Sequence, residues 1–293
     1  MPAPLLRVRG LHVEARVRRA GRTPVWRPIV NGVDLTVDRG QVLGLIGETG
    51  AGKSTLGLAA MGYARRGCRL SKGEIRFDGV ELRTAAPAVL HDMRGHKVAY
   101  VAQSAAAAFN PAHRILAQIL EVARIHGSAD RGRAQEHAVE LFERMALPDP
   151  RTFGERYPHE VSGGQKQRVC IARALAAEPD LVICDEVTSA LDPLVADGIL
   201  ELLMRLQREV GVSFVFITHD MAMVRAIADG ITVLRDGQVM EAGARDEVFA
   251  TPRSDYTVRL IESTPEMETG WLDRALESRA RRNDRAQASL PRR

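Results

Sequence analysis

The sequence predicts an α/β fold with a central sheet of largely parallel strands, and three observations favour it. A glycine-rich loop at residues 47–55 joins an apolar run, 42–46, to a helix-like segment, 56–65. Short, fully apolar runs such as 181–184 are typical of parallel strands that are buried on both faces. Polar residues follow these runs directly, at the sheet edge where α/β folds bind their ligands.

The glycine-rich loop has the spacing of a phosphate-binding loop, G-x-x-x-x-G-K-[ST]. Its glycines let successive backbone N–H groups point at one anion, and the helix N-terminus behind them adds partial positive charge. Lys53 supplies a full charge for the β- and γ-phosphates, and the Ser54 hydroxyl is placed to bind Mg²⁺. A turn that merely joins strand to helix is the alternative. The predicted nucleotide-binding residues are Gly47, Glu48, Thr49, Gly50, Ala51, Gly52, Lys53, Ser54 and Thr55.

The composition is that of an ordinary globular protein, with 45% hydrophobic and 27% charged residues. A net charge of +4 could indicate binding to nucleic acid or to an anionic membrane surface. An excess of positive charge this small more often reflects only charged side chains on a solvated surface. The three cysteines, Cys68, Cys170 and Cys184, are too far apart to indicate a zinc or redox site. No run approaches the roughly 18 apolar residues of a membrane span. Any membrane role is therefore expected to come through a partner.

The N-terminal residues 5–40 are expected to form short strands of an antiparallel sheet. Residues 33–37 alternate apolar and polar, which is typical of a sheet with one solvated face. Residues 74–82 carry a hairpin signal around Asp78-Gly79. Trp26 fits two roles, stacking on an adenine ring or covering a sheet edge.

The middle of the chain predicts a helical insertion. A strand pattern at 98–102 is followed by two amphipathic segments, 115–123 and 134–145, with a break at 127–130. We assign about residues 104–165 to this helical subdomain.

The later part of the chain returns to alternating strands and helices. Strands are expected at 181–184 and 212–217, and helices at 169–177 and 194–209, before a closing hairpin at 231–240. Residues 266–293 are highly charged, and we expect a disordered tail there.

A second set of motifs narrows the family. Val161-Ser162-Gly163-Gly164-Gln165, together with Gln103, Ser189-Ala190-Leu191-Asp192 and His219, resembles the nucleotide-binding subunit of an ATP-binding cassette (ABC) transporter. The resemblance covers about residues 5–265, and it implies that residues 1–265 form one nucleotide-binding domain. The implied fold is a P-loop NTPase (RecA-like) core with an N-terminal antiparallel β-subdomain and the inserted α-helical subdomain.

More narrowly, the chain is similar to the ATPases of dipeptide, oligopeptide and nickel importers. Phe109-Asn110-Pro111 after Gln103 resembles the end of their glutamine loop. Val248-Phe249, Pro252 and Tyr256-Thr257 resemble the segment that follows their core.

The resemblance implies a role for each motif residue, and each role has a chemical reason. Asp185, Ser54 and Gln103 are the implied Mg²⁺ ligands, because oxygen atoms suit this hard cation. Glu186 would orient or deprotonate the attacking water, and His219 would contact the γ-phosphate. The implied catalytic residues are thus Glu186, His219 and Gln103. Ser162, Gly163, Gly164, Gln165 and Asp192 would face the ATP held by a second subunit.

The implied function is an ATPase that powers an ABC importer of di- or oligopeptides or of a related small solute such as nickel, with ATP and Mg²⁺ as cofactors. The chain would be peripheral on the cytoplasmic face of the inner membrane. The implied partners are two transmembrane permease subunits, a second ATPase subunit that is identical or paralogous, and indirectly an extracytoplasmic solute-binding protein. No nucleic acid is expected. The alternative is a soluble cassette ATPase acting on nucleic acid or ribosomes. A non-hydrolysing regulatory cassette is a third possibility, against which Glu186 and His219 argue.

The sequence departs from the family pattern at several places. Val161 replaces the usual leucine, and Val187 the proline usual after the catalytic glutamate. Residues 104–108 are unusually small for a segment that in the family touches the membrane subunit. Ser254-Asp255 stand where histidine-proline is usual, and no cysteine cluster follows.

Overall fold

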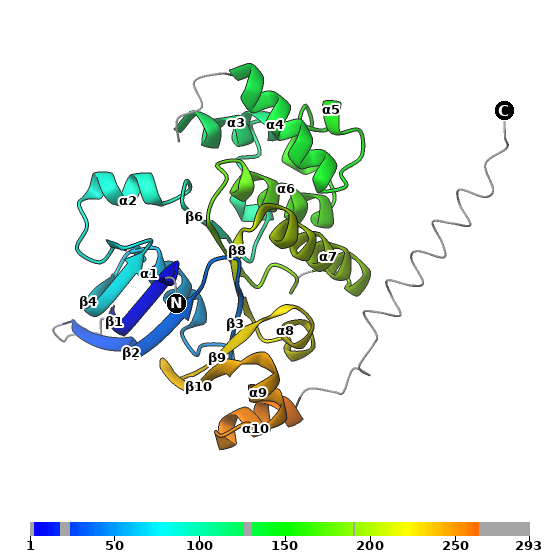
Figure 1. Ribbon diagram of the computed structural model, residues 1–293. Coiled ribbons are helices and arrows are strands. Elements are labelled where there is room, and N and C mark those ends of the chain that lie inside the picture. The colour runs from blue at the N-terminus through cyan, green and yellow to red at the C-terminus, as the bar shows by residue number, and fades with distance from the viewer. Residues whose placement is uncertain (1–2, 18–23, 126–130, 190, 264–293) are drawn as a thin grey trace.

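The computed structural model describes residues 3–17, 24–125, 131–189 and 191–263. Within them the strands form two sheets (Figure 1). The antiparallel sheet has the order β2 (Val25–Val37), β1 (Leu6–Val17), β4 (Cys68–Phe77) and β5 (Val80–Glu81). The other has the order β10 (Gln238–Ala244), β9 (Gly230–Arg235), β3 (Val42–Ile46), β8 (Ser213–Thr218), β7 (Leu181–Asp185) and β6 (Val98–Val101).

The second sheet is parallel except for β10, and its central strands are buried on both faces. Side chains alternate across a strand, so neighbouring residues enter different cores. Leu181 and Ile183 join the core that faces the antiparallel sheet, while Val182 and Cys184 join the core on the helical side. The predicted parallel core, with its fully apolar strands, is therefore confirmed.

Helices cover both faces of this sheet. α1 (Lys53–Ala60) lies between the sheets, where Leu56 packs with Leu6, Phe77 and Ile183. On the other face lie α6 (Gly163–Leu175) and α7 (Pro193–Val210), and α8 (Met221–Ile227) packs beside β3 and β8.

The helical insertion is also confirmed. α3 (Ile115–Ile125), α4 (Arg131–Arg144) and the short α5 (Pro150–Phe153) follow β6 and precede α6, as the green segment of Figure 1 shows. Phe142 and Phe153 pack with ring centroids 5.6 Å apart and anchor this unit. The predicted break at 127–130 lies outside the described residues.

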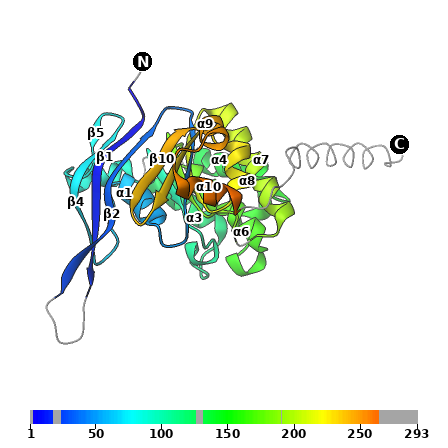
Figure 2. The same cartoon turned by 90° about the horizontal axis from the view of Figure 1, so that it is seen from below.

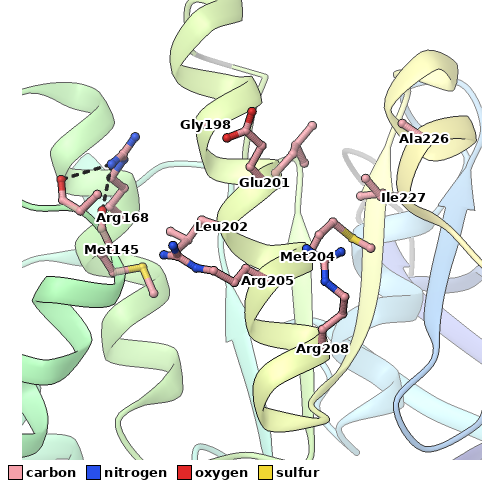
Figure 3. Close-up of a pocket in the computed structure, with 12 residues that line it drawn as sticks. Met145, Arg168, Gly198, Glu201, Leu202, Met204, Arg205, Arg208, Ala226 and Ile227 are labelled. Atoms are coloured by element: carbon pink, nitrogen blue, oxygen red, sulfur yellow. Dashed lines mark hydrogen bonds between the residues drawn. The ribbon is translucent and has the colours of Figure 1, made fainter. Parts of the chain in front are cut away.

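Two expectations about local structure are wrong. α1 ends at Ala60 rather than Arg65, because Gly62 takes the left-handed conformation (φ 69°) that terminates helices. β1 and β2 are long, at 12 and 13 residues, and Figure 2 shows them projecting as a hairpin. Sequence reasoning also missed α2 (Pro87–Met93), α8, α9 (Arg245–Ala250) and α10 (Asp255–Glu262), which are too short to show a clear period.

The predicted tail, 266–293, lies outside the described residues. In the part of the chain that the structure describes, no helix is both long and apolar enough to cross a bilayer.

Candidate functional site

The glycine-rich loop follows β3 and leads into α1. Gly47 and Gly52 have φ values of 146° and 100°, which side chains rarely adopt. A Cβ on Gly47 would lie 2.0 Å from the Leu234 carbonyl oxygen, and one on Gly52 would lie 2.9 Å from that of Ile29. Because β9 and β2 approach the loop this closely, glycine is required at both positions.

Lys53 is almost completely buried beneath this loop, with 5% of its surface exposed. Its Nζ donates hydrogen bonds to the carbonyl oxygens of Gly47 (2.7 Å) and Glu48 (2.9 Å). Burial lowers the pKa of Lys53, and the carboxylates of Glu186, Asp185 and Glu48 oppose that shift. The loop thus holds a cation beside the acidic pair that ends β7.

Asp185 is fixed by two hydroxyl donors from different elements. Ser54 Oγ donates to Oδ1 at 2.9 Å, and the Tyr100 hydroxyl donates to Oδ2. Burial, followed by the hydrogen bond to Asp185, raises the pKa of Tyr100 well above its usual range. Sequence reasoning did not single out Tyr100, and the available signal was one hydroxyl in an otherwise apolar strand.

The donor set here fits Mg²⁺ rather than a metal held by protein alone. Ser54 and Asp185 offer oxygen atoms, and Mg²⁺ is usually held by one or two carboxylates together with substrate phosphates. No group of three His, Cys, Asp or Glu side chains that could hold a metal ion occurs among the described residues.

Glu186 is the centre of a second polar group. It takes a left-handed backbone (φ 49°), and its N–H donates to the Ile217 carbonyl of β8 at 2.8 Å. Gln103 Nε2 donates to Oε2 at 2.7 Å, and His219 Nδ1 lies 3.5 Å from Oε1. The structure therefore brings Gln103, Glu186 and His219 together, and it places the Gln103 amide on Glu186 rather than on Asp185.

The Ser162 segment begins α6 with a capping box. Ser162 Oγ accepts from the Gln165 N–H at 3.2 Å, and Gln165 Oε1 accepts from the Ser162 N–H at 3.0 Å. Ser162 and Gly163 are exposed. Among the described residues, no hydrogen bond joins this segment to the phosphate loop.

Asp192 lies beside this segment, at the start of α7. Its Oδ1 accepts from the Val195 N–H at 3.1 Å, and a Cβ on Gly164 would lie 2.7 Å from Val195 Cγ1. Two helix N-termini are thus packed side by side.

Trp26 lies on β2, an edge strand of the antiparallel sheet. It is 38% exposed on β2, and the Arg69 guanidinium lies 4.2 Å from the ring centroid.

Comparison with known proteins identifies the family. Residues 30–189 match the family model for ABC transporters. The oligopeptide transport ATP-binding protein OppD of Bacillus subtilis (strain 168) is 38% identical over 247 residues, which cover 82% of this chain and 67% of that protein. The dipeptide transport ATP-binding protein DppD of Haemophilus influenzae is 36% identical over 241 residues, covering 82% of this chain and 73% of that protein.

Solved structures of ABC cassettes are similar to this chain as well. The dimeric ATP-binding cassette MJ0796, bound to ADP and Pi, superposes with a TM-score of 0.70 at 25% identity, covering 82% of this chain and 98% of that chain. CbiO1 from Clostridium perfringens, part of the transporter complex CbiONQ, gives a TM-score of 0.70 at 25% identity, covering 85% and 92%. The predicted fold class and the predicted resemblance to peptide-importer ATPases are confirmed. The chain belongs to the ABC transporter family, as an ATP-binding ATPase subunit.

Proposed function

We propose that this chain hydrolyses ATP to power the import of peptides through membrane permeases. The observation that carries the proposal is the gathering of Lys53, Ser54, Asp185, Glu186 and His219 at the carboxyl ends of neighbouring parallel strands. The similarity to OppD and DppD, named as oligopeptide and dipeptide transport proteins, supports peptides as the solute.

Binding begins at the loop of residues 47–55. The N–H groups of the loop other than that of Glu48, which donates to Tyr256, would receive the phosphates together with the N-terminus of α1. Lys53 would turn from the carbonyls of Gly47 and Glu48 to the β- and γ-phosphates. Ser54 and Asp185 would hold Mg²⁺ together with Gln103, and the ion would neutralise charge on the phosphate oxygens when bound. Gln103 would have to release its hydrogen bond to Glu186 in order to contact the ion.

Hydrolysis requires a water in line with the γ-phosphate. Glu186 orients this water or takes its proton, since its side chain is 17% exposed and lies at the strand end beside Asp185. His219 donates to the γ-phosphate oxygens as charge develops there. The backbone of Glu186 is left-handed (φ 49°), a conformation that is uncommon for residues other than glycine.

A second ATPase subunit completes each site. The exposed Ser162–Gly163 helix start forms an anion-binding end, and Asp192 lies beside it. We assign the residues 162–165 and Asp192 to the nucleotide held by the partner subunit, and the dimeric structure of the MJ0796 cassette supports this assignment. Loss of the γ-phosphate contacts after hydrolysis would then open the dimer.

The permease subunits and a solute-binding protein are the remaining proposed partners, with this chain peripheral on the cytoplasmic face of the inner membrane. Affinity purification of the full chain from native membranes tests this: two multi-span membrane proteins are expected to co-purify. Retention on DNA or heparin at moderate salt, with no membrane protein bound, would instead support the nucleic-acid alternative.

Replacing Tyr100 with Phe is expected to raise the Mg²⁺ concentration needed for half-maximal hydrolysis about three- to tenfold, the worth of one hydrogen bond. The hydroxyl fixes Asp185 Oδ2, so without it the carboxylate can turn away from the ion. ATP binding without Mg²⁺ should stay unchanged in calorimetric titrations. Tyr63→Phe, at a surface tyrosine under Arg94, is the matched control. An unaltered Mg²⁺ dependence in the Tyr100 variant would show that Asp185 needs no second donor.

A further inference from the structure

A third hydrophobic cluster lies under the start of the phosphate loop. It joins Ile46, the residue before Gly47, to side chains from α8, β9 and the C-terminal helices α9 and α10. Its buried members are Ile46, Met221, Val224, Ala228, Ile231, Val233, Val248 and Tyr256. Tyr256 comes from α10 and is only 5% exposed, so the C-terminal part of the described chain is packed against the nucleotide site.

The Tyr256 hydroxyl reaches the loop itself. It accepts a hydrogen bond from the Glu48 N–H at 3.1 Å, while the Arg235 guanidinium lies 4.9 Å from the centre of its ring. The Glu48 carbonyl accepts from Lys53 Nζ at 2.9 Å. The backbone of Glu48 is therefore held on its N–H side by α10 and on its carbonyl side by the phosphate-binding lysine.

α10 is itself anchored to the sheet. Glu241 of β10 accepts from the N–H groups of Arg253 (2.9 Å) and Ser254 (3.2 Å), directly before the helix. Ser254 then caps the helix by accepting from the Tyr256 N–H at 3.3 Å. These contacts fix the Tyr256 hydroxyl relative to β10, whose hairpin with β9 passes beside Gly47.

We propose that Tyr256 is a positioning residue for nucleotide binding, through which α10 holds the phosphate loop in its binding shape. The inference rests on the proposed role of residues 47–55 in binding ATP. A glycine-rich loop has many accessible conformations, and ordering it on binding reduces affinity. The Glu48 N–H is occupied by Tyr256, so this bond orders the loop before ATP arrives. α10 lies outside the stretch 30–189 that the family model matches.

Tyr256→Phe tests this by removing the hydroxyl alone and leaving the ring against Arg235 and Ile46. With ATP as the probe and Tyr63→Phe as control, we expect the Kd for ATP to rise about three- to tenfold. KM should rise by the same factor, with kcat within about twofold. The thermal midpoint of the nucleotide-free protein should fall by about 2–4 °C relative to the control, because the Glu48 N–H loses its acceptor. Parental ATP affinity in Tyr256→Phe would overturn the inference.

A second variant covers the case in which Tyr256→Phe folds poorly. Glu241→Ala removes the anchor of α10 and leaves both tyrosine and loop intact, and we expect a smaller rise in Kd in the same direction. An unchanged Kd in this variant also counts against the inference. Lys53→Ala distinguishes failure of the proposed function from failure of this inference. If Lys53→Ala binds ATP with parental affinity, the proposed role of the loop in binding ATP is wrong. If Lys53→Ala loses ATP binding while Tyr256→Phe keeps parental affinity, only the role of Tyr256 is wrong.

Discussion

Glu186→Gln is expected to slow ATP hydrolysis by about 100- to 1,000-fold, because an amide cannot accept the proton of the attacking water. Glutamine has nearly the same shape and keeps an oxygen to accept from Gln103. ATP affinity should therefore stay within a few-fold of the parent, and the nucleotide should persist between two subunits. The variant is expected to accumulate as an ATP-bound dimer.

The rate of phosphate release measures the loss of hydrolysis. Size-exclusion chromatography with and without Mg-ATP measures the accumulation of the dimer. Glu209→Gln is a suitable control, since Glu209 lies on the exposed end of α7 and pairs only loosely with Arg205, at 4.0 Å. Hydrolysis at the parental rate in Glu186→Gln would remove Glu186 from the catalytic role. A slow variant that stays monomeric with ATP would contradict the shared-site arrangement instead.

Lys53→Ala is expected to weaken ATP binding by about 100-fold or more. Hydrogen bonds to charged groups contribute about 1.5–3 kcal/mol each, and 1.4 kcal/mol is a factor of ten in affinity. Lys53 is also buried, so the site keeps little water that could replace its charge at the phosphates. The variant leaves the carbonyls of Gly47 and Glu48 without their donor, which makes a modest loss of folding stability the second expected effect.

Calorimetric titration with ATP and thermal unfolding of the nucleotide-free protein measure these two effects separately. Lys72→Ala, at an exposed lysine of β4, controls for the loss of one positive charge. Normal ATP affinity in Lys53→Ala would show that the phosphates bind elsewhere.

Sequence reasoning placed the acidic pair and its neighbours at one sheet edge, and the structure brings them together. The reason is that parallel strands end at a common edge of the sheet. Gln103, Asp185 and His219 come close together there because β6, β7 and β8 are neighbours. The partner of each side chain was harder to foresee. Several polar side chains meet at this edge, and more than one pairing between them is possible. In the structure the Gln103 amide donates a hydrogen bond to Glu186.

The sequence by itself determined the phosphate loop, the alternation of strands and helices and the helical insertion. These features are encoded in consecutive residues, through glycine spacing and the periods of two and 3.6 residues that strands and helices impose. Only the tertiary structure decided that Tyr100 holds Asp185 across 85 positions of sequence and that Tyr256 holds Glu48 across 208. Such contacts depend on which strands and helices become neighbours, and no local pattern records that choice.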